Sequence, residues 1–395
     1  MKIAFVMDGL QIGGIEKVGA SYVKMFNKLG HKVTLINLDP TKKEMLNLYS
    51  GKVYRKINYK FSRKASPEQY AQLIKRFWWG RYVYPIVYTL LSAINILRKK
   101  IYRIFVDHEE YDVVIAFSGH FNDLTFVSSN FVRGKKKLCW LHGALYGYLL
   151  ISDGYLNLYR KIQNLVVLVD DAQIEALVYN HENNLNITKI YNPIQRMDNG
   201  LVTYNNVEKI KKLYGNFILM VARLDYPHKD HYTVIKAFEI LCRKGIEDYN
   251  LVFLGEGPEK ENIEKFISEL NSNISSKIYL LGSVENVDDY YKSASMLVHA
   301  SVAGEGLPTV ILEALSEGCP VISTDSKVGP REIIGDNKYG LLIPIQDAET
   351  MADNFYLMIM DEELRNKYSV LGKERAKDFA FEKIEKEVDR LIRDL

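Results

Sequence analysis

The sequence is poor in residues that build covalent or metal-stabilised frameworks. It has three cysteines, Cys139, Cys242 and Cys319, which are odd in number and widely spaced, so they form neither a disulfide framework nor a zinc-ligand pattern. It contains no Asp-x-Asp pair, no P-loop and no Gly-x-Ser-x-Gly turn. These absences argue against a disulfide-rich secreted protein, a zinc enzyme, a P-loop nucleotidase and a serine hydrolase of that type, and they indicate a reducing, cytoplasmic environment.

Apolar runs are short. Residues 1–7 are mostly apolar, but Asp8 interrupts them too soon for a signal peptide, so we expect a buried strand there. An uncharged run at 82–97 has 16 residues and includes Pro85, whereas roughly 20 apolar residues are needed to span a bilayer. We therefore expect an interfacial or buried helix over 82–97 and no membrane span.

Acidic residues are nearly missing from one stretch of the chain. Residues 52–103 contain thirteen Lys or Arg and a single acid, Glu68, so they carry +12; since the whole chain carries +3, the remainder sums to −9. Two of the three tryptophans, Trp78 and Trp79, also lie there. Basic and aromatic side chains together are typical of a surface that rests on anionic lipid headgroups. We expect peripheral contact with the inner face of the cell membrane; the alternative is a helix packed in a soluble domain, and nucleic acid is disfavoured because no nucleic-acid fold signature accompanies the charge.

Strand and helix signals alternate along most of the 395 residues. The alternation predicts an α/β protein with parallel sheets and helices on both faces, and because it restarts near residue 217 we expect two Rossmann-like, doubly wound domains. The first would span 1–195 and the second 196–375, with the boundary near 193–204, where an Asn-Pro pair and a polar stretch interrupt the periodicity. Ligands of such open sheets lie at the carboxyl ends of the strands, here in a cleft between facing domains.

The periodicities also predict individual elements. The expected strands are 2–7, 32–37, 113–117, 137–141, 165–169, 189–191, 217–221, 250–254, 278–281, 296–300 and 321–323, and the expected helices include 16–29, 232–244, 259–270 and 308–318. A final amphipathic helix, 381–395, has Ile384, Val388, Leu391 and Ile392 on one face.

The stretch 304–318 is the most informative part of the sequence. Glu305 lies in a glycine-flanked loop, Pro308 suits the first position of a helix, and Gly318 suits its end. Glu313 lies about a turn and a half inside this helix. A helix N-terminus attracts phosphate, and carboxylates accept hydrogen bonds from sugar hydroxyls. A phosphate at the helix tip with a sugar on the acids describes a nucleotide-sugar.

The spacing from Glu305 to Glu313 resembles the E-x7-E motif of the retaining glycosyltransferases of family 4, which have the GT-B fold. The resemblance implies that Glu305 contacts the donor sugar and Glu313 the nucleotide ribose, with the backbone at Gly306, Leu307, Pro308 and Thr309 beside the phosphates. It also implies that the last segment, 376–395, crosses back onto the first domain. Metal-dependent GT-A transferases hold a divalent ion with an Asp-x-Asp pair, which this chain lacks, so we expect neither a metal nor another cofactor.

Other segments resemble this family less specifically. Arg223 and Lys229 follow a predicted strand and correspond to the cations that bind the donor diphosphate. The planar guanidinium group of Arg and the compact ammonium group of Lys both suit a departing diphosphate. Gly13 and Gly14 resemble the Gly-Gly loop after the first strand, which would approach the phosphate or the acceptor. His142 matches a histidine that hydrogen-bonds the donor sugar. For each, the alternative is structural: a surface salt bridge, a tight turn or a packed histidine.

Four further segments fit the family outline. Gly255 belongs to a Gly-x-Gly-Pro turn near the base, with Pro258 starting a helix, and Val284 lies in the loop that flanks the nucleobase. Residues 191–194 match the interdomain segment, and Gly329 opens another helix whose role we expect to be packing.

Taken together, the sequence predicts a retaining, metal-independent glycosyltransferase. We expect it to move a hexose or an N-acetylhexosamine from a nucleoside-diphosphate sugar, with UDP favoured, to an acceptor glycan. The basic aromatic segment 52–103 suits a polyprenyl-diphosphate-linked acceptor in bacterial surface-polysaccharide assembly. The alternatives are a GT-B nucleotide-sugar epimerase, a sugar phosphorylase and a non-enzymatic nucleotide-sugar-binding protein.

Overall fold

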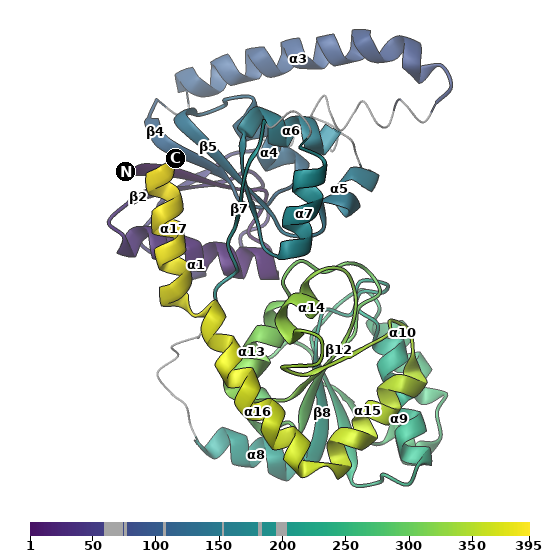
Figure 1. The fold of residues 1–395 in the computed structure, drawn as a ribbon. Helices are drawn as coiled ribbons and strands as arrows, with labels where there is room; N and C mark the ends of the chain where they lie inside the picture. The colour runs from purple at the N-terminus through teal and green to yellow at the C-terminus, as the bar shows by residue number, and fades with distance from the viewer. Residues whose placement is uncertain (59–73, 75–76, 106–107, 152–153, 181–183, 195–203) are drawn as a thin grey trace. The chain divides into compact units, whose positions relative to one another are not determined.

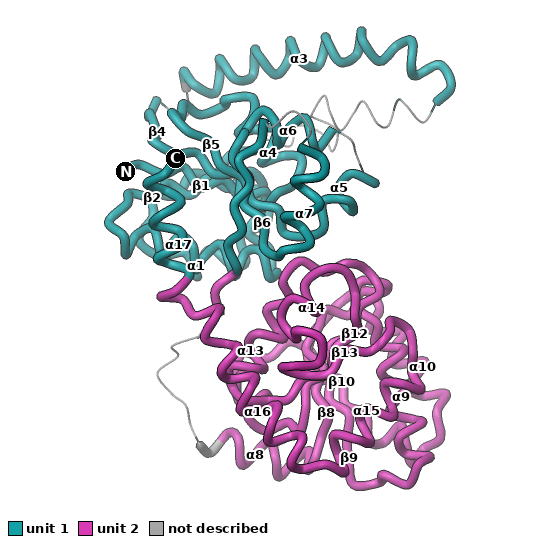
Figure 2. Tube along the Cα trace, viewed as in Figure 1, with its two compact units in different colours: residues 1–191, 384–395 teal, residues 192–383 magenta. Residues whose placement is uncertain are grey.

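The computed structural model describes residues 1–58, 74, 77–105, 108–151, 154–180, 184–194 and 204–395. The chain forms two compact units (Figure 2): unit 1 comprises Met1–Tyr191 with Ile384–Leu395, and unit 2 comprises Asn192–Lys383. Most of the predicted boundary, 193–204, and part of the basic segment, 59–73 and 75–76, lie outside the described residues.

Unit 1 is built on a seven-stranded, all-parallel sheet with the order β3-β2-β1-β4-β5-β6-β7. Its strands are β1 (Lys2–Met7), β2 (Lys32–Asn37), β3 (Val53–Lys56), β4 (Glu110–Ala116), β5 (Arg133–Leu141), β6 (Asn164–Val167) and β7 (Asn186–Lys189). Its helices are α1 (Gly14–Lys28), α3 (Gly80–Phe105), α4 (Phe121–Ser128), α5 (Leu145–Ile151), α6 (Gly154–Ile162), α7 (Asp170–Val178) and the short η1 (Leu46–Leu48). The first two strands coincide with their predicted bounds, because both are mostly apolar runs that the sheet buries on both faces after the first residue.

Unit 2 repeats this architecture with a six-stranded parallel sheet of order β10-β9-β8-β11-β12-β13 (Figure 1). Its strands are β8 (Asn216–Val221), β9 (Tyr249–Leu254), β10 (Ile278–Leu280), β11 (Met296–His299), β12 (Val321–Thr324) and β13 (Leu341–Ile343). Its helices are α8 (Tyr204–Tyr214), α9 (His231–Arg243), α10 (Lys260–Ser268), α11 (Ser272–Ser275), α12 (Val287–Ser293), α13 (Thr309–Glu317), α14 (Gly329–Ile334), α15 (Ala348–Met360), α16 (Glu362–Ala376) and η2 (Lys377–Phe379). Two doubly wound units confirm the predicted fold class.

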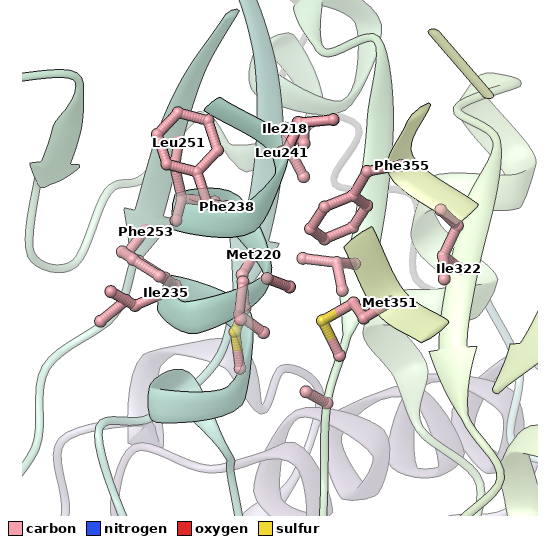
Figure 3. Close-up of a cluster of buried hydrophobic side chains, with 14 of the residues drawn as sticks. Ile218, Met220, Ile235, Phe238, Leu241, Leu251, Phe253, Ile322, Met351 and Phe355 are labelled. Carbon is pink, nitrogen blue, oxygen red and sulfur yellow. The ribbon is translucent and has the colours of Figure 1, made fainter. Parts of the chain in front are cut away.

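The core of unit 2 lies where α9 and α15 cover the sheet. Figure 3 shows Ile235 and Phe238 of α9 beside Leu251 and Phe253 of β9, with Met351 and Phe355 of α15 on the other side of the cluster. All of these side chains are at most 1% exposed. Burial of one such side chain contributes about 1.5–3 kcal/mol, and this layer holds the strand ends that carry the site in fixed positions.

The last helix, α17 (Phe381–Asp394), packs within unit 1. Three of its four predicted apolar positions, Ile384, Val388 and Ile392, are at most 1% exposed, whereas Leu391 is half-buried. Glu385 of α17 forms an ion pair with Lys28 of α1, 2.6 Å from Nζ to Oε2. The apolar stripe therefore covers unit 1, after the chain has passed through the whole of unit 2.

Helix α3 is longer than the predicted segment, and a row of its apolar side chains is exposed. It runs for 26 residues with Pro85 near its start and contains no acid. Near its end, Tyr102 is buried and packs edge-on against Phe126 and Phe131. Exposed apolar side chains recur every three or four residues along it: Tyr82, Ile86, Leu90, Ile94, Leu97, Ile101 and Ile104. In the described part of the chain, no helix combines the length and the apolar character needed to cross a membrane.

Candidate active site

The strand orders define where each sheet can bind a ligand. In unit 2 the order reverses between β8 and β11, and in unit 1 between β1 and β4. The loops that leave the carboxyl ends of such a pair diverge to opposite sides of the sheet and leave room for a ligand. In unit 2 these loops carry Arg223 and Lys229 after β8, and His299 and Glu305 at the end of β11.

Hydrogen bonds tie the two loops of unit 2 together. The amide of Asp230 donates to the carbonyl of Ala300 (3.0 Å), and the hydroxyl of Ser301 donates to the carbonyl of His228 (2.6 Å). Asp230 also caps α9, since its carboxylate accepts from the Thr233 amide at 3.1 Å. These bonds hold Lys229, at the start of α9, beside the loop that carries Glu305.

Lys229 is the centre of a polar cluster. Its ammonium group forms an ion pair with Oε1 of Glu305 and lies 3.3 Å from Nε2 of His299, whose Nδ1 lies 3.0 Å from the hydroxyl of Ser323. The side chains of Lys229 and Glu305 are each 19% exposed, and that of His299 is 1% exposed. The cluster is therefore shielded from bulk water but open enough for a ligand to reach the cation.

Burial and neighbouring charges determine the protonation states of His299 and Glu305. Burial, followed by the positive charge of Lys229, lowers the pKa of His299 to about 3, so the imidazole is neutral at physiological pH. Burial alone would raise the pKa of Glu305, but the charge of Lys229, the neighbouring His299 and hydrogen bonds from Lys229 and Ser301 together hold that pKa below its usual value. The cluster consists of one cation, one anion and a neutral imidazole that accepts a hydrogen bond from Lys229.

Close backbone packing fixes the loop around Glu305. The Glu305 amide donates to the Lys327 carbonyl (2.5 Å), and the Val328 amide donates back to the Glu305 carbonyl (3.0 Å). Gly329 is needed here because a Cβ at this position would collide with the carbonyl of Gly306. The expected packing role of Gly329 thus has a concrete origin: it lets α14 press against the Glu305 loop.

The helix that follows the Glu305 loop begins at a different residue from the predicted one. Helix α13 begins at Thr309, and Pro308 is its N-cap residue with an extended backbone (φ −66°, ψ 108°), not its first helical residue. Gly318 ends the helix in the left-handed conformation (φ 77°), as predicted. The helix begins one residue later than predicted, because the ψ angle of Pro308 is extended, as is usual for an N-cap residue. The peptide groups of Gly306 and Leu307 lead directly into this N-terminus, whose first amides have no intrahelical partner.

Glu313 lies on α13 and has a different partner from Glu305. Its Oε2 accepts a hydrogen bond from the hydroxyl of Tyr291 on α12, at 2.9 Å. Tyr291 is 1% exposed, and burial followed by the charge of Glu313 raises the pKa of its hydroxyl. The hydroxyl of the buried Tyr291 therefore fixes the position of the Glu313 carboxylate.

Not every predicted residue joins the Lys229 cluster. The guanidinium of Arg223 is exposed and pairs with the carboxylate of Asp225. Gly255, with φ 139°, follows β9, and a Cβ there would collide with the carbonyl of Ala222. Val284 is half-buried in the loop after β10. Helix α10 begins at Lys260, so Pro258 lies before the helix instead of starting it.

The predicted residues of unit 1 lie at its own strand ends. His142 follows β5, and its Nε2 lies 2.6 Å from the Phe117 carbonyl, so this nitrogen carries the proton and donates. Burial lowers the pKa of His142 to about 4, which leaves Nδ1 as an acceptor. Gly13 is the N-cap of α1 and Gly14 its first residue.

Three residues of this arrangement were not predicted from the sequence: His299, Ser323 and Tyr291. His299 had a usable signal, because it is the last residue of a strand six positions before Glu305. Tyr291 had none, because a tyrosine in a helix is most often a core residue. In the described residues, no group of three or more His, Cys, Asp or Glu side chains is arranged to hold a metal ion.

Comparisons with known proteins identify relatives of this chain. A family model described as "Glycosyl transferases group 1" matches residues 205–375. An uncharacterized glycosyltransferase of Methanocaldococcus jannaschii is 30% identical over 330 residues, which are 73% of this chain and 78% of that protein. The N-acetylgalactosamine-N,N'-diacetylbacillosaminyl-diphospho-undecaprenol 4-alpha-N-acetylgalactosaminyltransferase of Campylobacter jejuni is 33% identical over 236 residues, 60% of this chain and 61% of that protein.

The solved structure of Anabaena HepE in complex with UDP-glucose has a TM-score of 0.75 over 100% of both chains at 17% identity, a likeness that concerns the fold. Three findings agree with one another. The chain has two parallel-sheet units, unit 2 has a polar cluster at its switch point, and relatives of the chain are glycosyltransferases. The chain belongs to the group 1 glycosyltransferases and has the GT-B fold.

Proposed function

We propose that the enzyme transfers a hexose or an N-acetylhexosamine from a UDP-sugar to a lipid-linked glycan, with retention of anomeric configuration and without a metal ion. The observation that carries this proposal is the Lys229–Glu305 pair beside the neutral His299, at the switch point of unit 2. A diphosphate leaving group gains negative charge as the glycosidic bond breaks, and a fixed ammonium group stabilises that charge.

Four side chains have tasks in this proposal. Lys229 binds the departing diphosphate, together with the backbone amides at the start of α13. Glu305, held by its backbone pairing with Val328, accepts hydrogen bonds from donor-sugar hydroxyls. Glu313, supported by Tyr291, accepts hydrogen bonds from the ribose. Arg223 is exposed and would exchange Asp225 for a phosphate when the donor binds.

Binding of the donor is tested by thermal shift against UDP-, GDP- and ADP-sugars. A ligand that binds only the folded chain raises its melting temperature, and we expect UDP-sugars to give the largest shift. Glu305→Ala should abolish transfer while UDP still shifts the melting temperature. Unchanged turnover in this variant would remove the role assigned to Glu305, and no shift with any nucleotide-sugar would overturn the proposal as a whole.

Stereochemistry and metal dependence have their own tests. The anomeric proton coupling of the product, measured by NMR before mutarotation, should match that of the donor sugar. Turnover after treatment with EDTA should equal turnover before it, because Lys229 and the helix N-terminus supply the positive charge. An inverted product or a loss of activity that Mg²⁺ or Mn²⁺ restores would contradict these two parts of the proposal.

The acceptor side is proposed from helix α3 and from the relatives. The exposed apolar row of α3 is accompanied by Arg81, Lys100 and other basic residues, with no acid on the helix. Such a helix lies in the headgroup region, because apolar side chains enter the acyl boundary while cations meet anionic headgroups. The Campylobacter jejuni relative is named for an undecaprenyl-diphosphate acceptor, which fits an enzyme that works at a membrane surface.

Membrane contact is tested by sedimentation with vesicles that contain phosphatidylglycerol. The double variant Ile86→Glu/Leu90→Glu should bind these vesicles about ten-fold or more weakly, because two apolar contacts are lost and two like charges are added. The matched control is Leu213→Glu, which replaces an equally exposed leucine on α8 of unit 2. Equal binding of the double variant and the control would contradict a membrane role for α3.

A further inference from the structure

The ammonium group of Lys229 can donate three hydrogen bonds, and the protein accepts two of them. One goes to Oε1 of Glu305 and one to Nε2 of His299, which lies 3.3 Å from Nζ. The two acceptor atoms are 3.9 Å apart, so they occupy adjacent proton positions of the ammonium group. Within the part of the chain that the structure describes, this group has no further hydrogen-bond partner. Its third N–H therefore has a defined direction, away from both acceptors.

The tautomer of His299 follows from its two neighbours. An ammonium group can only donate, so Nε2 of His299 accepts from Lys229, and the proton of the neutral imidazole lies on Nδ1. Nδ1 lies 3.0 Å from the hydroxyl of Ser323, and this hydroxyl donates onward to the carbonyl of Thr324 at 3.1 Å. The series of hydrogen bonds therefore runs in one direction, from Lys229 to the Thr324 carbonyl. The opposite tautomer of His299 would place two donors face to face.

The sheet of unit 2 holds this series in place. His299 and Ser323 are register partners on the adjacent parallel strands β11 and β12, so their side chains lie on the same face of the sheet. Both residues are at most 2% exposed. The hydroxyl of Thr324 accepts from the Ser301 amide at 2.9 Å and donates to the Ser301 carbonyl at 3.1 Å, which joins β12 to the loop after β11. The position of Nε2 is therefore set by paired strands and not by a mobile side chain.

A buried histidine can also be a packing residue, and the contacts of His299 argue against that role. Among the described residues, the hydrogen-bond partner of its Nε2 is the ammonium group of Lys229, whose side chain is partly exposed. A neutral acceptor orients this cation without cancelling its charge, whereas a second carboxylate would neutralise it. Glu305 supplies the one negative charge of the cluster, and His299 supplies a second point of attachment.

We infer that His299 is a positioning residue for sugar transfer: it orients Lys229 so that the third N–H meets the leaving phosphate, and Ser323 fixes the tautomer that this requires. The leaving phosphate is the β-phosphate, which is bonded to the sugar in the donor. Its negative charge is complete only after the glycosidic bond has broken, so the orientation of Lys229 stabilises the transition state and bound UDP more than the intact donor. The inference rests on the proposed function, because it takes a nucleoside diphosphate as the ligand.

The test uses the full chain and calorimetry with two ligands, UDP and UMP, of which UMP lacks the β-phosphate. His299→Leu removes the acceptor at similar volume, whereas His299→Gln offers an amide oxygen in place of Nε2. Ser323→Ala removes the acceptor of Nδ1 and is the milder change. The matched control is Ser293→Ala, because Ser293 is a buried serine on α12 whose hydroxyl donates to the Asp289 carbonyl at 2.6 Å. Melting temperatures without ligand verify that each variant folds, and release of UDP from UDP-glucose and UDP-N-acetylgalactosamine gives kcat and KM.

We expect His299→Leu to weaken UDP binding about ten-fold, because a hydrogen bond to a charged group is lost, and to change UMP binding by less than about two-fold. UDP affinity should stay within about three-fold of the wild type in His299→Gln and fall by about three-fold or more in Ser323→Ala. The double variant Lys229→Met/His299→Leu should bind UDP as Lys229→Met does, since His299 acts through Lys229. In His299→Leu, kcat should fall about ten-fold while KM for the donor stays within about three-fold.

Equal losses of affinity for UDP and UMP would show that His299 only packs, and would overturn the inference. The same holds if His299→Gln binds UDP as weakly as His299→Leu, if His299→Leu weakens binding further in the Lys229→Met background, or if kcat does not change. Should His299→Leu fail to fold, Ser323→Ala decides the question, and UDP affinity equal to that of Ser293→Ala would overturn the inference. A wild type that binds neither UDP nor a UDP-sugar would refute the proposed function instead.

Discussion

Removing the ammonium group of Lys229 should weaken UDP binding in two ways at once. The variant Lys229→Met loses the attraction between the ammonium and the diphosphate, and it also leaves the carboxylate of Glu305 without its counter-ion. Two unit charges 4 Å apart interact by about 4 kcal/mol at an effective dielectric constant near 20. Because each side chain of the pair is 19% exposed, solvent reduces this energy, and we expect a total loss of about 3 kcal/mol, which is about a hundred-fold in the dissociation constant.

A double-mutant cycle separates the two contributions. Glu305→Gln alone should leave UDP affinity unchanged or improve it, since the Lys229 charge is then no longer shared, although transfer should fall because the donor sugar loses its acceptor. In Lys229→Met/Glu305→Gln the repulsion from Glu305 is gone, so UDP should bind about ten-fold better than to Lys229→Met. Lys236→Met, on the exposed face of α9, is the control for a lysine that faces solvent.

Isothermal titration calorimetry with UDP measures all four dissociation constants of the cycle, and urea unfolding verifies that each variant is folded. Losses in UDP affinity that simply add, or a Glu305→Gln variant that binds UDP as poorly as Lys229→Met, would contradict the predicted coupling between the two side chains. Either result would mean that Lys229 and Glu305 do not act on the phosphates as one charge pair.

Three further predictions concern the support of the site. Gly329→Ala should destabilise unit 2 by about 2 kcal/mol or more in urea unfolding, and lower transfer, because the new Cβ meets the carbonyl of Gly306. Tyr291→Phe should weaken UDP binding by about three- to ten-fold in calorimetry, because the Glu313 carboxylate loses the hydroxyl that orients it. Burial lowers the pKa of His231 to about 4; the unfolded chain therefore binds a proton between pH 6.5 and 4 that the folded chain does not. The free energy of unfolding of the wild type should fall, relative to His231→Gln, by about 1.4 kcal/mol per pH unit as the pH decreases through this window.

Each of these predictions has a matched comparison. Gly147→Ala, where nothing lies within 4 Å of the added Cβ, should be neutral or stabilising; equal destabilisation by both glycine variants would reject the steric argument. Tyr368→Phe removes a hydroxyl that donates to the Asn337 carbonyl and should not alter UDP affinity. Parallel stability curves for wild type and His231→Gln would show that His231 is not the acid-sensitive group.

The sequence predicted the elements whose patterns are uniform. Strands β1 and β2 coincide with their predicted ranges, because each is a mostly apolar run bounded by polar or glycine positions. Helix α16 was not predicted: its first turn is acidic and its apolar positions are too sparse for a clear stripe. The edge strands β3 and β13 have only four and three residues, too few for any period to show.

The candidate site was predictable in its residue types and not in its contacts. Lys229 and Glu305 are 76 residues apart in sequence, and they meet because β11 pairs with β8 and their loops are hydrogen-bonded to each other. Strand order depends on long-range packing, which no local pattern records. For the same reason the contact between the side chains of Asp8 and His120 in unit 1, 112 residues apart, could not be read from the sequence.

Hydrogen exchange of backbone amides on addition of UDP tests whether the nucleotide binds to unit 2, because it reports where in the chain the ligand protects the backbone. We expect slower exchange in two segments of unit 2, residues 222–230 and 304–311, with little change at residues 13–16 of unit 1. Protection confined to residues 13–16, or no protection in either segment of unit 2 at saturating UDP, would contradict it.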